Sequence, residues 1–177
     1  IVGRKDFLMI ERKYLAHFLD SSFGSGTPAY ARLGKDLEEF NEELNPDVET
    51  KHNIWGETSV VHSGYEPQAE VDPFYYEYDD ALSEKIAEIA NERITGDGCK
   101  TTMVDVLLKK GTDGIETVWA YREDVKIIPS SFGGDTSGIQ IPFTIYKEGN
   151  RVKGTWDNAK KTFTAPPAAQ SLAAVVD

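Results

Sequence analysis

The sequence predicts an α+β fold that is mostly β, with one helix lying on the strands. Short runs rich in β-branched and aromatic residues recur along the chain, separated by turns rich in Gly, Asn and Asp. One longer stretch instead has apolar residues at helical spacing. A length of 177 residues fits one domain with a single core, and no apolar run approaches the roughly 18 residues that span a bilayer.

The chain before residue 80 is predicted to be mainly extended. Its apolar and aromatic segments predict strands at residues 6–13 with an extension over 14–19, at 48–57, at 58–65 and at 71–78. Gly56 and Gly64 are expected to break the extended structure of the second and third segments. The Gly- and Ser-rich residues 21–28 predict a loop.

A short helix is predicted between these strands. Leu37, Phe40 and Leu44 are spaced three and four residues apart, which places them on one face of a helix. Asn45 and Pro46 would end it, because the residue before a proline is disfavoured in the helical conformation. So short a helix is marginal by itself and would need support from packing.

Residues 80–95 predict the one clear helix. Its apolar side chains share one face, whereas its charged side chains lie elsewhere; the apolar set is Leu82, Ile86, Ile89, Ala90 and Ile94. Asp79 or Asp80 can cap the first turn, and Gly96 stands where a helix end favours a left-handed residue. The narrow apolar stripe predicts that this helix packs against one side of a sheet.

The chain after the helix predicts strands joined by turns. Strands are expected at residues 101–108, 117–121, 124–129, 139–146, 152–156 and 162–164. Turns are expected at 111–114, 148–150 and 157–158, and a loop at 130–137. From residue 165 onward the composition shifts to Ala, Pro and Val, which predicts a tail. We therefore expect one domain over residues 1–164 and a C-terminal arm over 165–177.

The net charge of −11 is concentrated in one block of the chain. Residues 36–84 hold fifteen acidic residues and one basic residue, Lys51, whereas the remainder holds fifteen acidic and eighteen basic residues. A solvated acidic surface that keeps the protein soluble is one interpretation. The other interpretations are a fixed negative surface that another molecule slides past, or a surface that meets the basic remainder of a second copy.

The residues that most often carry chemistry form no catalytic or metal-binding pattern. His17, His52 and His62 have neither the spacing of a zinc protease nor cysteine partners, and the single Cys99 cannot form an internal disulfide. Strong acidity also disfavours a protein that grips nucleic acid through its phosphates. We therefore predict that the protein is not an enzyme and uses no cofactor and no catalytic or metal site.

Residues 44–73 read LNPDVETKHNIWGETSVVHSGYEPQAEVDP and resemble the signature of the major tail proteins, or tail tube proteins, of bacteriophages that infect Gram-positive bacteria. That signature has an Asn-Pro step, a Glu-Thr-Lys stretch, and then Ile-x-Gly, Gly-Tyr-x-Pro and acidic-Pro-aromatic steps. Here these are Asn45-Pro46, Glu49-Thr50-Lys51, Ile54-Trp55-Gly56, Gly64-Tyr65-Glu66-Pro67 and Asp72-Pro73-Phe74-Tyr75.

A second block resembles the C-terminal hairpins of the same family. Its parts are IPFTIY at residues 141–146, GNRVKGT at 149–155, Asp157-Asn158 and Lys161-Thr162-Phe163. The start Gly3-Arg4-Lys5-Asp6 is also similar to that of the family. The resemblance covers most of the chain, except the 130–137 loop and the Ala-rich end.

The resemblance implies a structural virion protein with a tail-tube-type β-sandwich or barrel, one flanking helix and extended arms at residues 1–6 and 165–177. Such proteins form hexameric rings that stack into a tube, the conduit for DNA ejection into the host. The implied partners are further copies of the chain, the tape measure protein, and tail terminator or baseplate proteins. Double-stranded DNA would pass without specific binding, and no membrane is involved. The protein would be assembled in the host cytoplasm and reside in the virion tail.

The resemblance also gives the charged residues expected roles. The acids expected to face the lumen are Glu38, Glu42, Glu49 and Glu70. The loop expected to contact the next ring includes Gly56, His62, Gly64, Tyr65 and Pro67. The basic residues expected between subunits are Arg151, Lys153, Lys160 and Lys161. In the alternative interpretation, the four acids do not face the lumen but pair with these basic residues of the next subunit, which makes the acidic block an assembly surface.

A function of another class is a monomeric β-sandwich that binds a sugar or protein for a phage or at a cell surface. Trp55, Tyr65 and the aromatic residues 74–78 could line its binding patch. A tube protein should give rings or polymers on a sizing column, whereas this module should remain a compact monomer.

Overall fold

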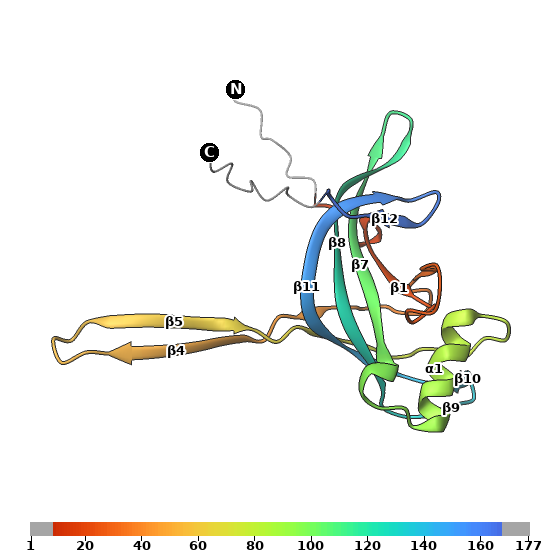
Figure 1. Ribbon diagram of the computed structural model, residues 1–177, viewed down its shortest axis with the longest axis horizontal. Coiled ribbons are helices and arrows are strands. Elements are labelled where there is room, and N and C mark those ends of the chain that lie inside the picture. Colours follow the sequence, from red (N-terminus) through yellow and green to blue (C-terminus); the bar gives the residue numbers. More distant parts are fainter. Residues whose placement is uncertain (1–8, 168–177) are drawn as a thin grey trace, which may run out of the picture.

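One strongly curved antiparallel sheet dominates the molecule (Figure 1). The computed structural model describes residues 9–167. Its strands are β1 (Leu15–Asp20), β2 (Tyr30–Arg32), β3 (Glu42–Glu43), β4 (Pro46–His52), β5 (Thr58–Tyr65), β6 (Gln68–Val71), β7 (Lys100–Gly111), β8 (Gly114–Pro129), β9 (Gly133–Asp135), β10 (Gly138–Gln140), β11 (Phe143–Asp157) and β12 (Thr162–Thr164). Its helices are α1 (Ala81–Glu92) and the 3-10 turns η1 (Arg12–Tyr14) and η2 (Gly96–Cys99). This confirms the predicted fold class, mostly β with one flanking α-helix.

The sheet has eight strands in the order β2-β1-β7-β8-β11-β6-β3, with β12 added to β11. The two other strand pairs, β4–β5 and β9–β10, are separate hairpins. Within the sheet, the long strands β7, β8 and β11 curl so far that Trp156 of β11 stacks on Phe18 of β1, with ring centroids 4.4 Å apart. The sheet nevertheless ends in the unpaired edges of β2 and β3, so it is open within one protomer.

Each face of the sheet carries its own core, because neighbouring strand residues point to opposite faces. Val104 and Val106 lie in a cluster with Phe18, Tyr30 and Trp156. On the opposite face lies a larger cluster, to which the sheet contributes Leu19, Ala69, Val71, Met103, Val125, Ile127, Phe143 and Ile145. Helix α1 covers one end of that second face (Figure 1).

Helix α1 packs as its sequence predicts. Leu82, Ile86 and Ile89 are buried, each at most 3% exposed. The Asp80 carboxylate caps the helix by accepting a hydrogen bond from the Ser83 amide at 3.1 Å. The residue predicted to end the helix, Gly96, is wrong. The helix instead ends just before Arg93, which takes the left-handed conformation with φ of 51°, and Gly96 begins η2.

Three of the N-terminal predictions are wrong. The described part of the run at residues 6–13 contains η1 and no strand; only from Leu15 does the chain pair with β7, while residues 6–8 lie outside the described residues. The predicted helix at 37–44 is an irregular segment followed by β3. Phe40 of this segment packs into the larger hydrophobic cluster, on the sheet face that α1 covers. The strand predicted at 71–78 ends at Val71 in β6, and beyond it only Tyr75 forms an isolated bridge.

The strands at 58–65 and 162–164 and the turns at 111–114 and 157–158 are confirmed. Strand β4 begins earlier than predicted and ends at His52, so Gly56 lies in the turn. Gly64 does not break β5, which instead has a register shift nearby. The segments 117–121 and 124–129 join in β8, and the 130–137 loop contains β9.

The turn predicted at 148–150 is wrong. Strand β11 continues through it by bulges, where Gly149 and Asn150 have φ of 104° and 55°. A bulge lets the extra residues leave the ladder, so the strand need not reverse. The predicted arm at residues 1–6 lies outside the described residues, and so do residues 168–177 of the arm predicted at 165–177.

Candidate assembly interface

Strands β4 and β5 form a two-stranded arm that extends far from the sheet (Figure 1). We call residues 46–65 the arm. Every residue of β4 is exposed, and so is every residue of β5 except the half-buried Gly64. A two-stranded hairpin is at best marginally stable by itself in water, so an arm of this length is expected to gain stability from a partner surface.

The tip of the arm is a preformed turn that presents two apolar side chains. The Asn53 side-chain oxygen accepts hydrogen bonds from the amides of Trp55 at 3.0 Å and Glu57 at 2.9 Å. Gly56 allows the turn because its φ is +80°. Ile54 is 99% exposed and Trp55 81% exposed. Large apolar side chains held in this way are typical of contact sites between proteins.

The root of the arm is fixed to the sheet by backbone hydrogen bonds. The Glu66 amide donates to the Leu44 carbonyl at 3.1 Å, and the Lys147 amide of β11 donates to the Pro67 carbonyl at 3.1 Å. The Asn45 side chain donates to the Glu66 carbonyl at 3.1 Å. These contacts fix where the arm leaves the sheet.

A buried cluster of charged side chains lies beneath this root. The Lys147 side chain is 1% exposed, and its ammonium group lies 2.7 Å from Asp105 and 2.8 Å from Glu42. His17 Nδ1 lies 2.6 Å from the second oxygen of Asp105. Arg151 bridges Asp105 at 3.3 Å and Glu123 at 3.0 Å. We call these six residues the buried charge cluster.

The cluster shifts the ionisation of its two central carboxyls in opposite directions. Burial alone would raise the pKa of Asp105, but the hydrogen bond with His17 and the charge of Lys147 outweigh it and hold the pKa far below its usual range. Burial raises the pKa of Glu42, and the negative charge of Asp105 adds to this, against the opposing effect of Lys147. One Glu42 oxygen, Oε1, is buried and has no hydrogen-bond partner among residues 9–167.

His17, Glu42 and Asp105 have ligand atoms within 4.8 Å of one another, the spacing of a metal site. The donors do not fit a metal ion well, because the Lys147 ammonium already lies within 2.8 Å of both carboxylates. A divalent cation there would be repelled by Lys147 and Arg151. The cluster is therefore explained as a structural support that positions β3, β11 and the arm root.

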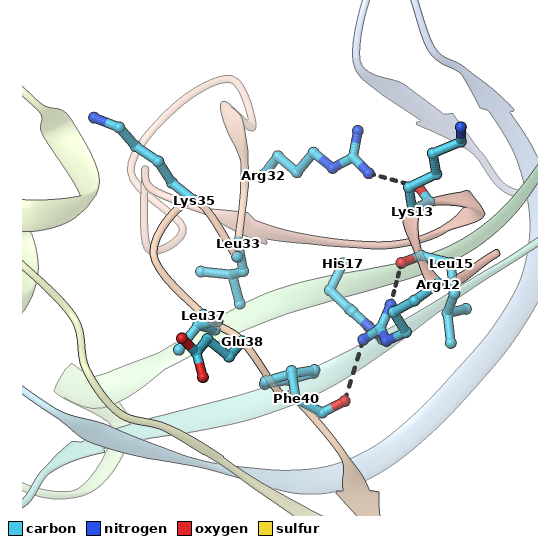
Figure 2. Close-up of a pocket in the computed structure, with 11 residues that line it drawn as sticks. Arg12, Lys13, Leu15, His17, Arg32, Leu33, Lys35, Leu37, Glu38 and Phe40 are labelled. Carbon is cyan, nitrogen blue, oxygen red and sulfur yellow. Dashed lines mark hydrogen bonds between the residues drawn. The ribbon is translucent and has the colours of Figure 1, made fainter.

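A cavity of about 430 Å³ lies on the other side of His17, between η1, β2 and the segment that leads to β3 (Figure 2). We call it the cationic pocket. Its positively charged lining residues are Arg12, Lys13, Arg32 and Lys35, and its apolar lining residues are Leu15, Leu33, Leu37 and Phe40. Glu38 is the one carboxylate among its lining residues.

The two arginines of the pocket are held by backbone carbonyls. Arg12 donates to the Phe40 carbonyl at 3.1 Å, and Arg32 donates to the Lys13 carbonyl at 2.9 Å. Within residues 9–167, neither guanidinium group has a carboxylate partner within ion-pair distance. Their orientation is thus fixed while their positive charge is not neutralised by a carboxylate.

The acids expected at the lumen do not lie together. Glu38 is in the cationic pocket, Glu42 is in the buried charge cluster and Glu49 is on the arm. Glu70 is exposed on β6, opposite Thr144 of β11, on the sheet face that α1 leaves uncovered. Because the charge of Glu42 is paired with Lys147 inside the protomer, it is the least suited of the four to act on a passing molecule.

The residues expected between rings and between subunits occupy three regions. Gly56, His62, Gly64 and Tyr65 are on the arm and Pro67 is at its root, so that set is contiguous. Lys153 is exposed on β11, and Lys160 and Lys161 lie in or beside the turn before β12. Arg151 is instead bound within the protomer to Asp105 and Glu123.

Sequence reasoning missed the buried charge cluster. Even members in direct contact are far apart in the chain, as Glu42 and Lys147 are at 105 residues, and no local motif joins them. The one available signal was the charged residues inside apolar strands, such as Asp105 within the TTMVDVLL run. Such a residue in a central strand requires a buried partner.

No family model matches the chain, and no curated protein matches it. Three solved structures share 10% sequence identity with it. One is the PVC sheath/tube terminator of an extracellular contractile injection system in the extended state, with a TM-score of 0.48 over 84% of this chain and 98% of that chain. The anti-feeding prophage cap, an AFP tube terminating cap, gives 0.48 over 88% and 99%. A chain of the PVC sheath–tube complex in the extended state gives 0.47 over 84% and 93%.

Among the residues that the structure describes, no helix is both long and apolar enough to cross a membrane.

Proposed function

We propose that the chain is a structural protein of a phage tail tube, in which six copies form a ring and stacked rings form the conduit for DNA ejection. The observation that carries the proposal is the arm: an exposed, preformed hairpin with apolar residues at its tip, on a domain whose sheet has open edges. Both features are liabilities in a monomer and become contacts in an assembly. The motif order over residues 44–73 supports the same assignment.

The proposed channel wall is the exposed part of the sheet face opposite α1, at strands β6 and β11. Glu70, Thr144 and Tyr146 lie there, on strands β6 and β11. The net charge of −11 disfavours adhesion of DNA phosphates, so double-stranded DNA can pass without specific binding. In this proposal the chain acts without catalysis or cofactor in the virion tail, after assembly in the host cytoplasm with the tape measure protein and terminator or baseplate proteins. Residues 1–164 of the chain are the domain that assembles, and residues 165–177 are a separate C-terminal extension, distinct from the arm at 46–65.

The monomeric binding module is less well supported. That function needs an aromatic patch in a concave site. Here Trp55 is at the convex tip of the arm and Phe74 packs edge-on against Phe143, with centroids 5.1 Å apart. Tyr65 lies beside a cavity at the arm root, whereas Phe74 and Tyr75 line a different cavity of about 150 Å³ beside α1, so the expected aromatic residues do not share one site.

Electron microscopy of the concentrated full chain tests the proposal, with a sizing column run over a range of concentrations. Rings or tubes with a central channel are the expected result. A chain that remains a monomer at every concentration, both alone and with nucleating tail components, contradicts it.

A further inference from the structure

We propose that the arm tip of one copy inserts into the cationic pocket of another copy, with Trp55 as the anchor and Glu57 as the counter-charge. This rests on the proposed self-assembly and adds the receiving surface, which the sequence resemblance did not assign. The first argument is chemical. The tip offers an apolar pair, Ile54 and Trp55, followed by a carboxylate. The pocket offers the complement, an apolar wall that includes Leu37 and a rim with Arg12 and Arg32. The two rim lysines, Lys13 and Lys35, are already paired with Glu11 and Glu77, so the arginines carry the charge that the tip would meet.

The charge balance favours this pairing. The arm carries Asp47, Glu49 and Glu57 against one lysine, Lys51. In the pocket, Arg12 and Arg32 are oriented by backbone carbonyls and, within residues 9–167, are not neutralised by a carboxylate. An arginine fixed in this way can accept a carboxylate with little further loss of side-chain freedom.

The size of the pocket also fits. A volume of about 430 Å³ can hold a tryptophan side chain and part of the neighbouring isoleucine. Figure 2 shows Phe40 and Leu37 along one side of the cavity, with the side chains of Arg32 and Lys13 on the other. An indole between an apolar wall and guanidinium groups can gain both burial and cation–π attraction.

The two surfaces belong to different copies. The arm extends from the sheet on the side away from β1, which lies next to the pocket (Figure 1). The tip therefore does not reach its own pocket without leaving its root contacts. A contact between two different patches is head-to-tail, and repetition of such a contact gives a closed ring or an open stack.

Two full-chain variants test the contact. Trp55→Ala removes the anchor and leaves the pocket intact, and Arg32→Glu reverses a charge in the pocket and leaves the tip intact. Each should raise the concentration needed for tube growth by at least about tenfold, because buried tryptophan and arginine are the usual anchors of an interface. Tyr78→Ala, at a side chain that is 85% exposed, and Lys110→Glu, at an exposed lysine, are the matched controls and should assemble as the wild type does.

Mixing the variants gives the decisive result. The Trp55→Ala variant keeps a working pocket but has a defective tip, and the Arg32→Glu variant keeps a working tip but has a defective pocket. In an equal mixture, the only contact that can form is therefore between the tip of Arg32→Glu and the pocket of Trp55→Ala. Whatever particle each variant forms alone, protomer or single ring, analytical ultracentrifugation should show the mixture as a particle of twice that mass. Far-UV circular dichroism of both variants checks that they fold.

The outcomes separate this inference from the proposed function. If the wild type forms tubes and Trp55→Ala forms them equally well, the tip–pocket contact is wrong while the tube function stands. A mixture that gives no doubled particle likewise overturns the contact. A wild type that never assembles overturns both.

Discussion

His17 Nδ1 lies 2.6 Å from Asp105 Oδ1, although 88 residues separate them in the chain. The contact joins neighbouring strands β1 and β7, where His17 and Asp105 are direct register partners. The second Asp105 oxygen lies 2.7 Å from Lys147, so one carboxylate links β1, β7 and β11. Because Lys147 also contacts Glu42 and donates its amide to the Pro67 carbonyl, this carboxylate is connected to the arm root as well.

Replacement of Asp105 by Asn should destabilise the fold strongly. The change leaves the ammonium group of Lys147, whose side chain is 1% exposed, without its closest carboxylate. Loss of one partner from a buried ion pair typically costs roughly 3–5 kcal/mol of unfolding free energy. Urea denaturation measures the loss, and Asp113→Asn in the exposed β7–β8 turn is the control. A variant as stable as the control would show that the cluster contributes nothing to stability.

Stability should also fall in acid, through the same carboxyl. The pKa of Asp105 is lower in the folded chain than its ordinary value of 3.8. A group with a depressed folded pKa contributes stability above its unfolded pKa and loses it as the pH falls further. Between about pH 5 and pH 2 the wild type should therefore lose more unfolding free energy than Asp105→Asn does.

Glu42 should act with the opposite sign. Its pKa is raised in the folded chain, so the folded state takes up this proton first and gains stability as the pH falls toward the ordinary value of 4.5. Glu42→Gln should remove that gain, which makes the acid loss steeper in this variant than in the wild type. Urea denaturation at a series of pH values measures both slopes, and equal slopes in all three proteins would contradict the assigned shifts.

Truncation of Ile86 to Ala should test the packing of α1. Ile86 is fully buried in the larger hydrophobic cluster. Truncation of a buried isoleucine to alanine leaves a cavity and typically costs roughly 2–5 kcal/mol of unfolding free energy. Glu92→Ala on the exposed side of the same helix is the matched control. Thermal melting followed by circular dichroism should separate the two variants, and an unchanged melting temperature for Ile86→Ala would be incompatible with the packing described.

The helix and the strands could be predicted because their signals are local. In α1 the apolar residues repeat at helical spacing and Asp80 marks the start, so both the existence and the buried face of the helix followed from the sequence. Leu37 and Phe40 have the same spacing, yet they form no helix. Phe40 instead packs on His17, with ring centroids 4.6 Å apart. A contact that depends on tertiary structure thus overrode a local pattern.

The candidate site could be predicted only in part. The arm was anticipated as extended structure around Gly56, because the glycine and the flanking β-branched residues are neighbours in sequence. Its projection from the sheet, and the cationic pocket that includes Arg12 and Arg32, depend on how η1, β2 and the segment before β3 fold together. No spacing rule joins residues brought together in this way. For the same reason Glu42 was grouped with Glu70, although the fold pairs Glu42 with Lys147.

Charge reversal of the acidic block tests the channel itself. Glu70→Lys on the exposed sheet face should leave tube formation intact, because its neighbour across the strand pair is the uncharged Thr144. It should slow DNA ejection by roughly an order of magnitude, since six cations per ring create an attractive site for phosphates at every layer. Glu49→Lys on the arm should instead reduce tube growth, because it weakens the negative charge of a contact surface. Electron microscopy scores the tubes, and the rate of DNA release from particles built with each variant scores ejection.

Glu92→Lys on the outer side of α1 is the control for both measurements, since it makes the same charge change on a surface assigned to neither role. The salt dependence adds a second criterion. The slowing caused by Glu70→Lys should diminish as salt is raised, because charges are screened beyond about 10 Å at 0.1 M. A simple packing defect at β6 would persist at high salt. If Glu70→Lys and Glu49→Lys both behave like Glu92→Lys, the acidic block is a solvated outer surface and the channel assignment of Glu70 is wrong.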